Sequence, residues 1–151
     1  GTFASSGASA CTPCSSGKYA SALSATCQQC PGGAVPSDDG GSCAACGAGS
    51  SALSGDSTCT MCTSGKYAPA NSPTCEPCPS GQVPAAGQGS CRACAAGTFA
   101  ENGTMCTPCT SGKFAPASSP TCQPCDSGSV PADNLGSCRA CAAGSAAEIG
   151  A

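Results

Sequence analysis

The chain of 151 residues contains no histidine and no tryptophan, and leucine, isoleucine, valine and phenylalanine together supply only ten residues. Without histidine, the chain lacks the most frequent general base of enzymes and a frequent zinc ligand. Ten large apolar side chains cannot offset the entropy lost on ordering a chain of this length, about 1–2 kcal/mol for each residue's backbone. The sequence therefore predicts a protein that is not an enzyme and that is not held by a hydrophobic core.

Charge is equally sparse. The chain carries five basic and eight acidic residues, for a net charge of −3. The basic residues stand apart from one another, at Lys18, Lys66, Arg92, Lys113 and Arg139. Without a basic cluster, the sequence indicates neither nucleic-acid binding nor attachment to an anionic membrane. No apolar run approaches the roughly 18 residues of a membrane span, so no membrane insertion is expected in this segment.

Cysteine is what the chain has in excess, with 18 residues arranged as nine Cys-x-x-Cys pairs. Successive pairs follow at a constant step, except that the step from Cys91 to Cys106 is one residue shorter. The pairs begin at Cys11, Cys27, Cys43, Cys59, Cys75, Cys91, Cys106, Cys122 and Cys138. So regular a period indicates stacked units that are individually too short to fold unaided. Cysteine of this density is typical of disulfide-bonded proteins from oxidising compartments.

The repeats are of three types that alternate in a fixed order. We call them Lys-aromatic repeats (Lys18-Tyr19, Lys66-Tyr67, Lys113-Phe114), Val-Pro repeats (Val35-Pro36, Val83-Pro84, Val130-Pro131) and Ala-Gly repeats (Ala48-Gly49, Ala96-Gly97, Ala143-Gly144). The three-repeat block recurs after about 47–48 residues. This pattern indicates duplication of the block, and it is also the pattern expected if every third repeat faces the same way.

A glycine follows the second cysteine of each of the first eight pairs by three residues. These glycines are Gly17, Gly33, Gly49, Gly65, Gly81, Gly97, Gly112 and Gly128. A glycine at one fixed offset predicts a positive φ or a close backbone approach. We expect a small disulfide-rich fold: an elongated, solenoid-like rod of about nine 16-residue units, with strands of two to four residues and little or no helix. Residues 1–151 are predicted to form one continuous array.

The cysteine pairing has several solutions. Joining neighbouring pairs two by two, or binding one zinc ion with each two pairs, leaves one of the nine pairs unused. Bridges within each pair would form small strained rings. The staggered scheme, which we favour, joins the second cysteine of one pair to the first of the next. It gives Cys14–Cys27, Cys30–Cys43, Cys46–Cys59, Cys62–Cys75, Cys78–Cys91, Cys94–Cys106, Cys109–Cys122 and Cys125–Cys138.

The staggered scheme leaves one cysteine over at each end, Cys11 and Cys141. The segment Gly1-Thr2-Phe3-Ala4 matches Gly97-Thr98-Phe99-Ala100, so Cys11 corresponds to Cys106. We therefore expect both cysteines to pair outside this segment, and we interpret the segment as an excerpt from a longer secreted protein.

Few residues are candidates for a site. Cys-x-x-Cys is also a redox motif, but redox enzymes place one copy at a helix start in a βαβ fold. No catalytic residue, cofactor or metal is therefore predicted, and the adjacent Asp38 and Asp39 are interpreted as solvated turn residues. Asn102-Gly103-Thr104 is a sequon for N-glycosylation. The lysines Lys18, Lys66 and Lys113 form either a contact stripe or an ordinary solvated face.

The fragments Cys-x-x-Gly-x-Tyr resemble the ephrin-receptor-like cysteine-rich repeat and the first small module of tumour-necrosis-factor-receptor domains. The resemblance covers the whole chain and implies an elongated stalk with the staggered bridges. The chain departs from the motif at the aromatic position, which holds Val35, Val83 and Val130 in one type of repeat and Ser51 and Ala146 in another.

The loops, rich in Ala, Gly, Ser and Pro, are similar to those of secreted green-algal proteins, among them subunits of flagellar mastigonemes. We expect a structural protein of a filament or surface coat at the cell or flagellar surface. Its partners would be other copies, other filament or coat proteins, and glycans. The alternatives are a receptor-like ligand-binding stalk and a cysteine-rich surface antigen of the protozoan kind.

Overall fold

The computed structural model describes residues 1–147, which contain short β-hairpins and no helix. The chain divides into two compact units, and each is described by itself. The first unit comprises Gly1–Thr63, Tyr67–Glu76 and Ala86–Ser90, and the second comprises Ser64–Lys66, Pro77–Ala85 and, among the described residues, 91–147. That the repeats form one continuous array over residues 1–151 stays a prediction.

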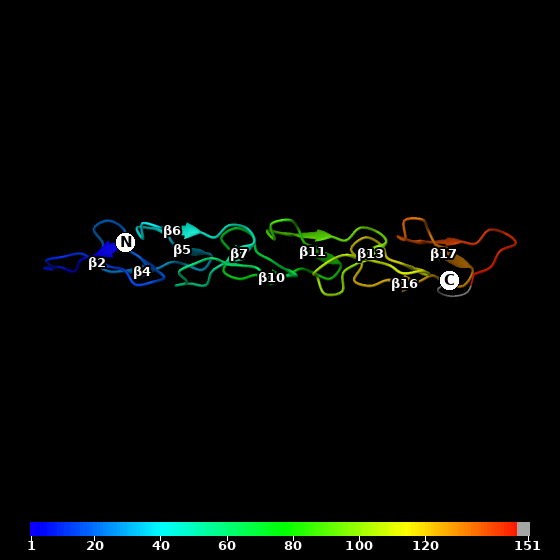
Figure 1. The fold of residues 1–151 in the computed structure, drawn as a ribbon, viewed down its shortest axis with the longest axis horizontal. Helices are drawn as coiled ribbons and strands as arrows, with labels where there is room; N and C mark the ends of the chain where they lie inside the picture. Colours follow the sequence, from blue (N-terminus) through cyan, green and yellow to red (C-terminus); the bar gives the residue numbers. More distant parts are fainter. Residues whose placement is uncertain (148–151) are drawn as a thin grey trace. The chain divides into compact units, whose positions relative to one another are not determined.

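Each strand has two or three residues and pairs with its neighbour in sequence, so the sheets are two-stranded (Figure 1). The strands are β1 (Thr2–Phe3), β2 (Thr12–Pro13), β3 (Lys18–Tyr19), β4 (Gln28–Gln29), β5 (Ala34–Pro36), β6 (Cys43–Ala45), β7 (Ser50–Ser51), β8 (Thr60–Met61), β9 (Lys66–Tyr67), β10 (Glu76–Pro77), β11 (Gln82–Pro84), β12 (Cys91–Ala93), β13 (Thr98–Phe99), β14 (Thr107–Pro108), β15 (Lys113–Phe114), β16 (Gln123–Pro124), β17 (Ser129–Pro131) and β18 (Cys138–Ala140). The prediction of very short strands without helix is confirmed.

One repeat of the first unit illustrates how the sequence forms a hairpin. Gly33 has a φ of +86°, as predicted for the turn after the cysteine pair, and strand β5 begins with the next residue. Strand β6 returns antiparallel to it, with Pro36 opposite Cys43. The amide of Cys46 then donates to the carbonyl of Gly33 at 2.8 Å and closes the hairpin.

Eight disulfides follow the staggered order, and each closes the loop of one repeat. They are Cys14–Cys27, Cys30–Cys43, Cys46–Cys59, Cys62–Cys75, Cys78–Cys91, Cys94–Cys106, Cys109–Cys122 and Cys125–Cys138. Seven of them link cysteines 13 residues apart, and Cys94–Cys106 spans 12 residues because its loop is one residue shorter. Cys11 is exposed and Cys141 half-buried, and neither forms a disulfide within the described residues.

The buried interior consists of cysteines and alanines. Among the described residues, the buried apolar side chains are Ala20, Cys30, Ala34, Cys46, Ala52, Cys62, Ala68, Cys78, Val83, Cys94, Ala100, Cys109, Ala115 and Cys125. Val83 is the one buried side chain in this set that is larger than cysteine. The aromatic rings of Tyr19, Tyr67, Phe99 and Phe114 are only half-buried. The residue that packs inside each such repeat is therefore the alanine after the aromatic residue, which the sequence analysis did not single out.

These alanines mark where one repeat meets the next. In the first unit, the amide of Gly49 donates at 2.8 Å to the carbonyl of Ala68, which lies in the following repeat. In the second unit, the amide of Gly97 donates to the carbonyl of Ala115 at 2.8 Å. Neighbouring repeats are therefore joined through backbone hydrogen bonds, whereas each disulfide closes the loop of a single repeat. A small side chain at this position allows the two backbones to approach each other.

The turn glycines also contact the loop two repeats further on. In the first unit, a Cβ atom added to Gly33 would collide with the carbonyl of Asn71. In the second unit, a Cβ atom on Gly81 would collide with the carbonyl of Ser118. Asn71 and Ser118 themselves have a φ of +63°. Each turn therefore needs glycine for its positive φ and for this close approach.

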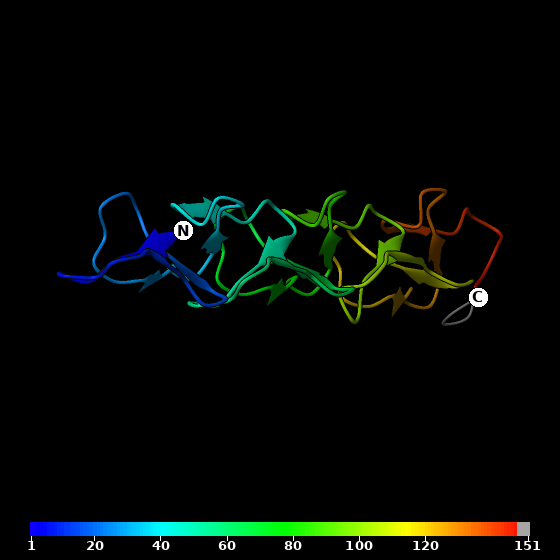
Figure 2. The same ribbon diagram turned by 60° about the vertical axis from the view of Figure 1, so that its left-hand side comes forward.

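The two Val-Pro repeats of the second unit have the same orientation. Figure 2 shows strands β11 (green) and β17 (orange) of two successive Val-Pro repeats drawn in the same direction. This arrangement agrees with contacts that run from each repeat to the next two.

The close approach at the turn glycines predicts unequal effects of two matched substitutions. Gly81 and Gly128 are the turn glycines of Val-Pro repeats and share a φ of +79°, but no atom of residues 1–147 lies within 4 Å of a Cβ atom added to Gly128. Gly128→Ala should lower the free energy of unfolding by about 1–2 kcal/mol, the cost of a left-handed alanine. Gly81→Ala should cost several kcal/mol, roughly 3–5, because the Ser118 loop must also move.

Differential scanning calorimetry of the oxidised chain measures this difference through the unfolding midpoint of each variant. Equal midpoints for the two variants would contradict the interlock between Gly81 and the Ser118 loop.

Candidate functional sites on the repeat surface

Sixteen of the 18 cysteines are bridged to a neighbouring pair, so no complete Cys-x-x-Cys dithiol exists in the oxidised protein between residues 1 and 147. The described residues contain no group of three or more His, Cys, Asp or Glu side chains arranged to hold a metal ion. They also contain no helix with the length and apolar character required to cross a membrane.

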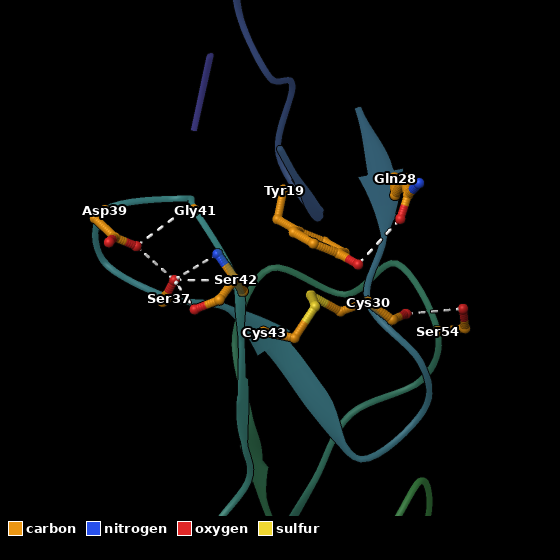
Figure 3. Close-up of a disulfide and its surroundings, with 9 residues drawn as sticks. All are labelled: Tyr19, Gln28, Cys30, Ser37, Asp39, Gly41, Ser42, Cys43 and Ser54. Carbon is orange, nitrogen blue, oxygen red and sulfur yellow. Dashed lines mark hydrogen bonds between the residues drawn. A yellow bond between two sulfur atoms is a disulfide. The ribbon is translucent and has the colours of Figure 1, made fainter. Parts of the chain in front are cut away.

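Asp39 shapes a loop of the first unit, as Figure 3 shows. Its carboxylate accepts a hydrogen bond from the Ser37 hydroxyl at 2.6 Å and another from the amide of Gly41 at 2.9 Å. The Ser37 hydroxyl, more than the Gly41 amide, lowers the pKa of Asp39 below its ordinary value of 3.8. A carboxylate with a lowered pKa is a poor general base near neutral pH, which agrees with the interpretation of Asp39 as a turn residue.

The loop of the last Val-Pro repeat is built in the same way. There the side-chain oxygen of Asn134 accepts from the amide of Gly136 at 3.0 Å. An amide side chain thus replaces the carboxylate of Asp39 at the equivalent position. A residue that cannot act as a base thus holds the equivalent turn, which supports the interpretation of Asp39 as a turn residue.

The sequon lies on a loop of the second unit. Asn102 and Thr104 are exposed, whereas Gly103 between them is buried and has a φ of +66°. The backbone of this loop faces the turn glycine Gly65, so the loop is anchored while the Asn102 side chain stays exposed. The geometry leaves room for a glycan at Asn102.

The three lysines of the Lys-aromatic repeats lie at equivalent strand positions. Lys18 is half-buried in the first unit, and Lys66 and Lys113 are exposed in the second.

The ion pair found among residues 1–147 joins Arg139 and Asp133 at 3.7 Å, and both side chains are largely exposed, so it adds little stability. The lysine ammonium groups are therefore available to other partners, and the contact stripe stays a prediction.

Two equivalent hollows lie beside two of these lysines. In the first unit a hollow of about 370 Å³ is lined by Phe3, Pro13, Ser15, Lys18, Thr26 and Cys27. In the second unit one of about 320 Å³ is lined by Phe99, Thr107, Pro108, Thr110, Lys113 and Cys122. Each combines an aromatic ring, a proline ring, hydroxyl groups and a lysine. At the intervening position of the sequence, Ser51 and Met61 replace the phenylalanine and the proline.

The sequence analysis missed these two hollows, which we call the Phe-Lys grooves. The signal was present in the recurrence of Phe, Thr-Pro and Lys at almost the same spacing, Phe3 to Lys18 and Phe99 to Lys113. It was not recognised because the aromatic residue and the lysine belong to different repeats, and only the packing of neighbouring repeats brings them together.

A larger hollow of about 720 Å³ lies in the first unit. Its wall includes Phe3, Cys11, Leu23 and Asp39. Leu23 is fully exposed and has a φ of +65°. The Asp39 carboxylate is engaged by its own loop, so it is not poised to activate the Cys11 thiol, and the hollow lacks the paired groups of a nucleophilic site.

No model of a known family matches the chain, and no curated protein matches it either. The resemblance to ephrin-receptor-like repeats therefore rests on the Cys-x-x-Gly motif, and the mastigoneme suggestion rests on loop composition.

The exposed sequon predicts a modification. When the chain is secreted from a eukaryotic cell, we expect a glycan on Asn102, because its side chain is accessible and its loop is polar. Intact-mass measurement before and after peptide N-glycosidase treatment should reveal it, and Asn102→Gln should abolish the mass shift. Asn71→Gln is the matched control, since Asn71-Ser72-Pro73 is not a sequon. A secreted chain of unmodified mass would refute the prediction.

Proposed function

We propose that this protein is a structural extracellular protein, a disulfide-stapled spacer in a filament or surface coat such as a flagellar mastigoneme. The observation that carries the proposal is the nature of the interior, where half-cystines and alanines occupy the positions that large apolar side chains take in other proteins. Disulfides of this density persist in oxidising surroundings, which supports a place outside the cytosol.

The order of the bridges suits a protein under tension. A force applied along the chain can pass from Cys14 through the bridge to Cys27, along the backbone to Cys30, and through the next bridge to Cys43. The loops between bonded cysteines lie outside this path. Only three residue steps and one bridge, with a Cα–Cα distance of 5.7 Å, separate equivalent points of successive repeats along the path.

The covalent path sets how far the protein can be stretched. Three residue steps and one bridge allow about 16 Å for each repeat, whereas the roughly 16 residues of a reduced repeat allow about 55 Å. Because the oxidised chain cannot lengthen beyond about 16 Å for each repeat, it keeps its dimensions under load even where its hydrogen bonds break.

Single-molecule force spectroscopy tests this mechanical role. The oxidised chain should show a contour length of about 16 Å for each repeat, and replacing Cys94 and Cys106 together by serine should add about 36 Å by releasing one loop. If the chain under oxidising conditions showed a contour length near that of the reduced chain, the result would contradict the proposal. Cryo-electron microscopy of the native assembly would then decide between a filament and a coat.

A ligand-binding stalk is the second candidate function, and the two Phe-Lys grooves favour it. Each groove offers an aromatic and a proline surface, hydroxyl groups and a lysine without an ion-pair partner among residues 1–147. These groups fit a carboxylated sugar, whose ring face packs on aromatic surface and whose carboxylate pairs with lysine.

An oligogalacturonide probe in isothermal titration calorimetry tests this candidate. Two sites are expected in the native chain and one site in either Phe99→Ala or Lys113→Ala, because the groove of the first unit remains. Lys66→Ala is the matched control and should keep both sites, since Ser51 and Met61 occupy the corresponding groove positions. Absence of binding by the native chain would remove the candidate.

A further inference from the structure

The two cysteines of a bridge differ in how deeply they are buried. The second cysteine of a pair is buried in most repeats: Cys30, Cys46, Cys94 and Cys125 are at most 1% exposed, and Cys62, Cys78 and Cys109 are 8–9% exposed. Their partners are all half-buried: Cys43, Cys59, Cys75, Cys91, Cys106, Cys122 and Cys138. Each of these seven bridges thus has an interior end and a surface end.

The packing of the repeats causes this asymmetry. The second cysteine opens a repeat, and the loop of the next repeat folds over it. The hydroxyl of Ser54 donates to the carbonyl of Cys30 at 3.0 Å, as Figure 3 shows. The amide of Gly55 donates to the same oxygen at 3.2 Å. The amide of Ser118 covers Cys94 in the same way, at 2.9 Å. In each bridge, the first cysteine of a pair begins or precedes a short strand and stays half-buried.

We propose that these seven disulfides are polarised toward thiol attack, so that an external thiol always attacks the surface sulfur. In the Cys30–Cys43 bridge, a thiolate bonds to the sulfur of Cys43, the bond between the two cysteine sulfurs breaks, and Cys30 leaves as a thiolate that takes a proton from water. The products are a mixed disulfide on Cys43 and a free thiol on Cys30. The attack requires access to the sulfur and a leaving thiolate that the surroundings can stabilise.

The buried cysteine slows attack by the external thiol, because this cysteine must leave as a thiolate. A thiolate on Cys94 would form among apolar groups, because Cys94 belongs to a buried cluster with Val83 and Ala100. An unpaired charge in such surroundings is poorly stabilised. Attack on the interior sulfur itself is blocked because the residue is 0% exposed.

The same packing speeds the reverse step, in which the freed thiol attacks the mixed disulfide. The freed Cys94 thiol stays next to the mixed disulfide on Cys106 and cannot diffuse away, so its effective concentration is high. It re-forms the bridge and expels the external thiol. A disulfide that a monothiol opens once therefore forms again, and the series of bridges is preserved without a repair enzyme.

One bridge provides an internal control. Cys14 and Cys27 are both half-buried, so neither end of this disulfide is fully protected. It should react faster than the other bridges, and the mixed disulfide should form on both of its cysteines. The bridges of Cys62, Cys78 and Cys109 should follow, and those of Cys30, Cys46, Cys94 and Cys125 should be slowest.

The test exposes the oxidised chain, with the Cys11 and Cys141 thiols alkylated beforehand, to glutathione for short times and then quenches with acid. Peptide mass spectrometry locates the glutathione. We expect at least tenfold more glutathione on Cys43 and Cys106 than on Cys30 and Cys94. Equal labelling of both ends of these bridges would overturn the proposal, as would a Cys14–Cys27 bridge that reacts more slowly than the rest.

A variant series separates the leaving-group effect from simple loosening. Val83→Thr places a hydroxyl beside Cys94 with little change of shape and should speed reduction of Cys94–Cys106 several-fold. Val130→Thr, at the half-buried equivalent position, should leave that rate unchanged. Val83→Ala loosens the packing without adding a donor, so an acceleration equal to that of Val83→Thr would refute the leaving-group explanation.

Discussion

The structure depends on a disulfide bond, made again in every repeat, that joins cysteines about 13 residues apart. On the chain-entropy model such a bridge contributes about 3 kcal/mol by restricting the unfolded chain. The repeats need this contribution, because their interior holds alanine and half-cystine and Val83 is the one larger apolar side chain buried among the described residues. Without the bridges, few interactions remain to offset the conformational entropy that the loops lose on folding.

Other features of the repeat follow from this constraint. A short loop with both ends fixed brings neighbouring backbones close together, so that backbone amides such as that of Gly33 bond directly to the next repeat. Close backbones leave no room for side chains at the contact points, which explains glycine at the turns and alanine after the aromatic residue. In seven of the eight bridges the second cysteine of the pair is buried by this packing, so the packing that the sulfur bridges permit also shields them.

The features that depend on spacing along the chain could be predicted from the sequence. The staggered pairing, the glycine turns and the very short strands recur with the cysteine pairs, and such a period is visible without coordinates. The features that depend on contact between repeats could not. Asn71, Ser118 and Leu23 occupy one left-handed loop position, yet they share no side-chain chemistry. The Phe-Lys grooves likewise arise only where Phe99 of one repeat meets Lys113 of the next.

The most direct test of this disulfide pairing is peptide mass spectrometry of the native, unreduced protein, with free thiols blocked at once on isolation. The account predicts peptides joined through the eight staggered bridges, with each second cysteine linked to the first cysteine of the next pair. Free thiols or bound metal at most of the 18 cysteines would contradict it, because the chain would then have neither a core nor staples to hold it.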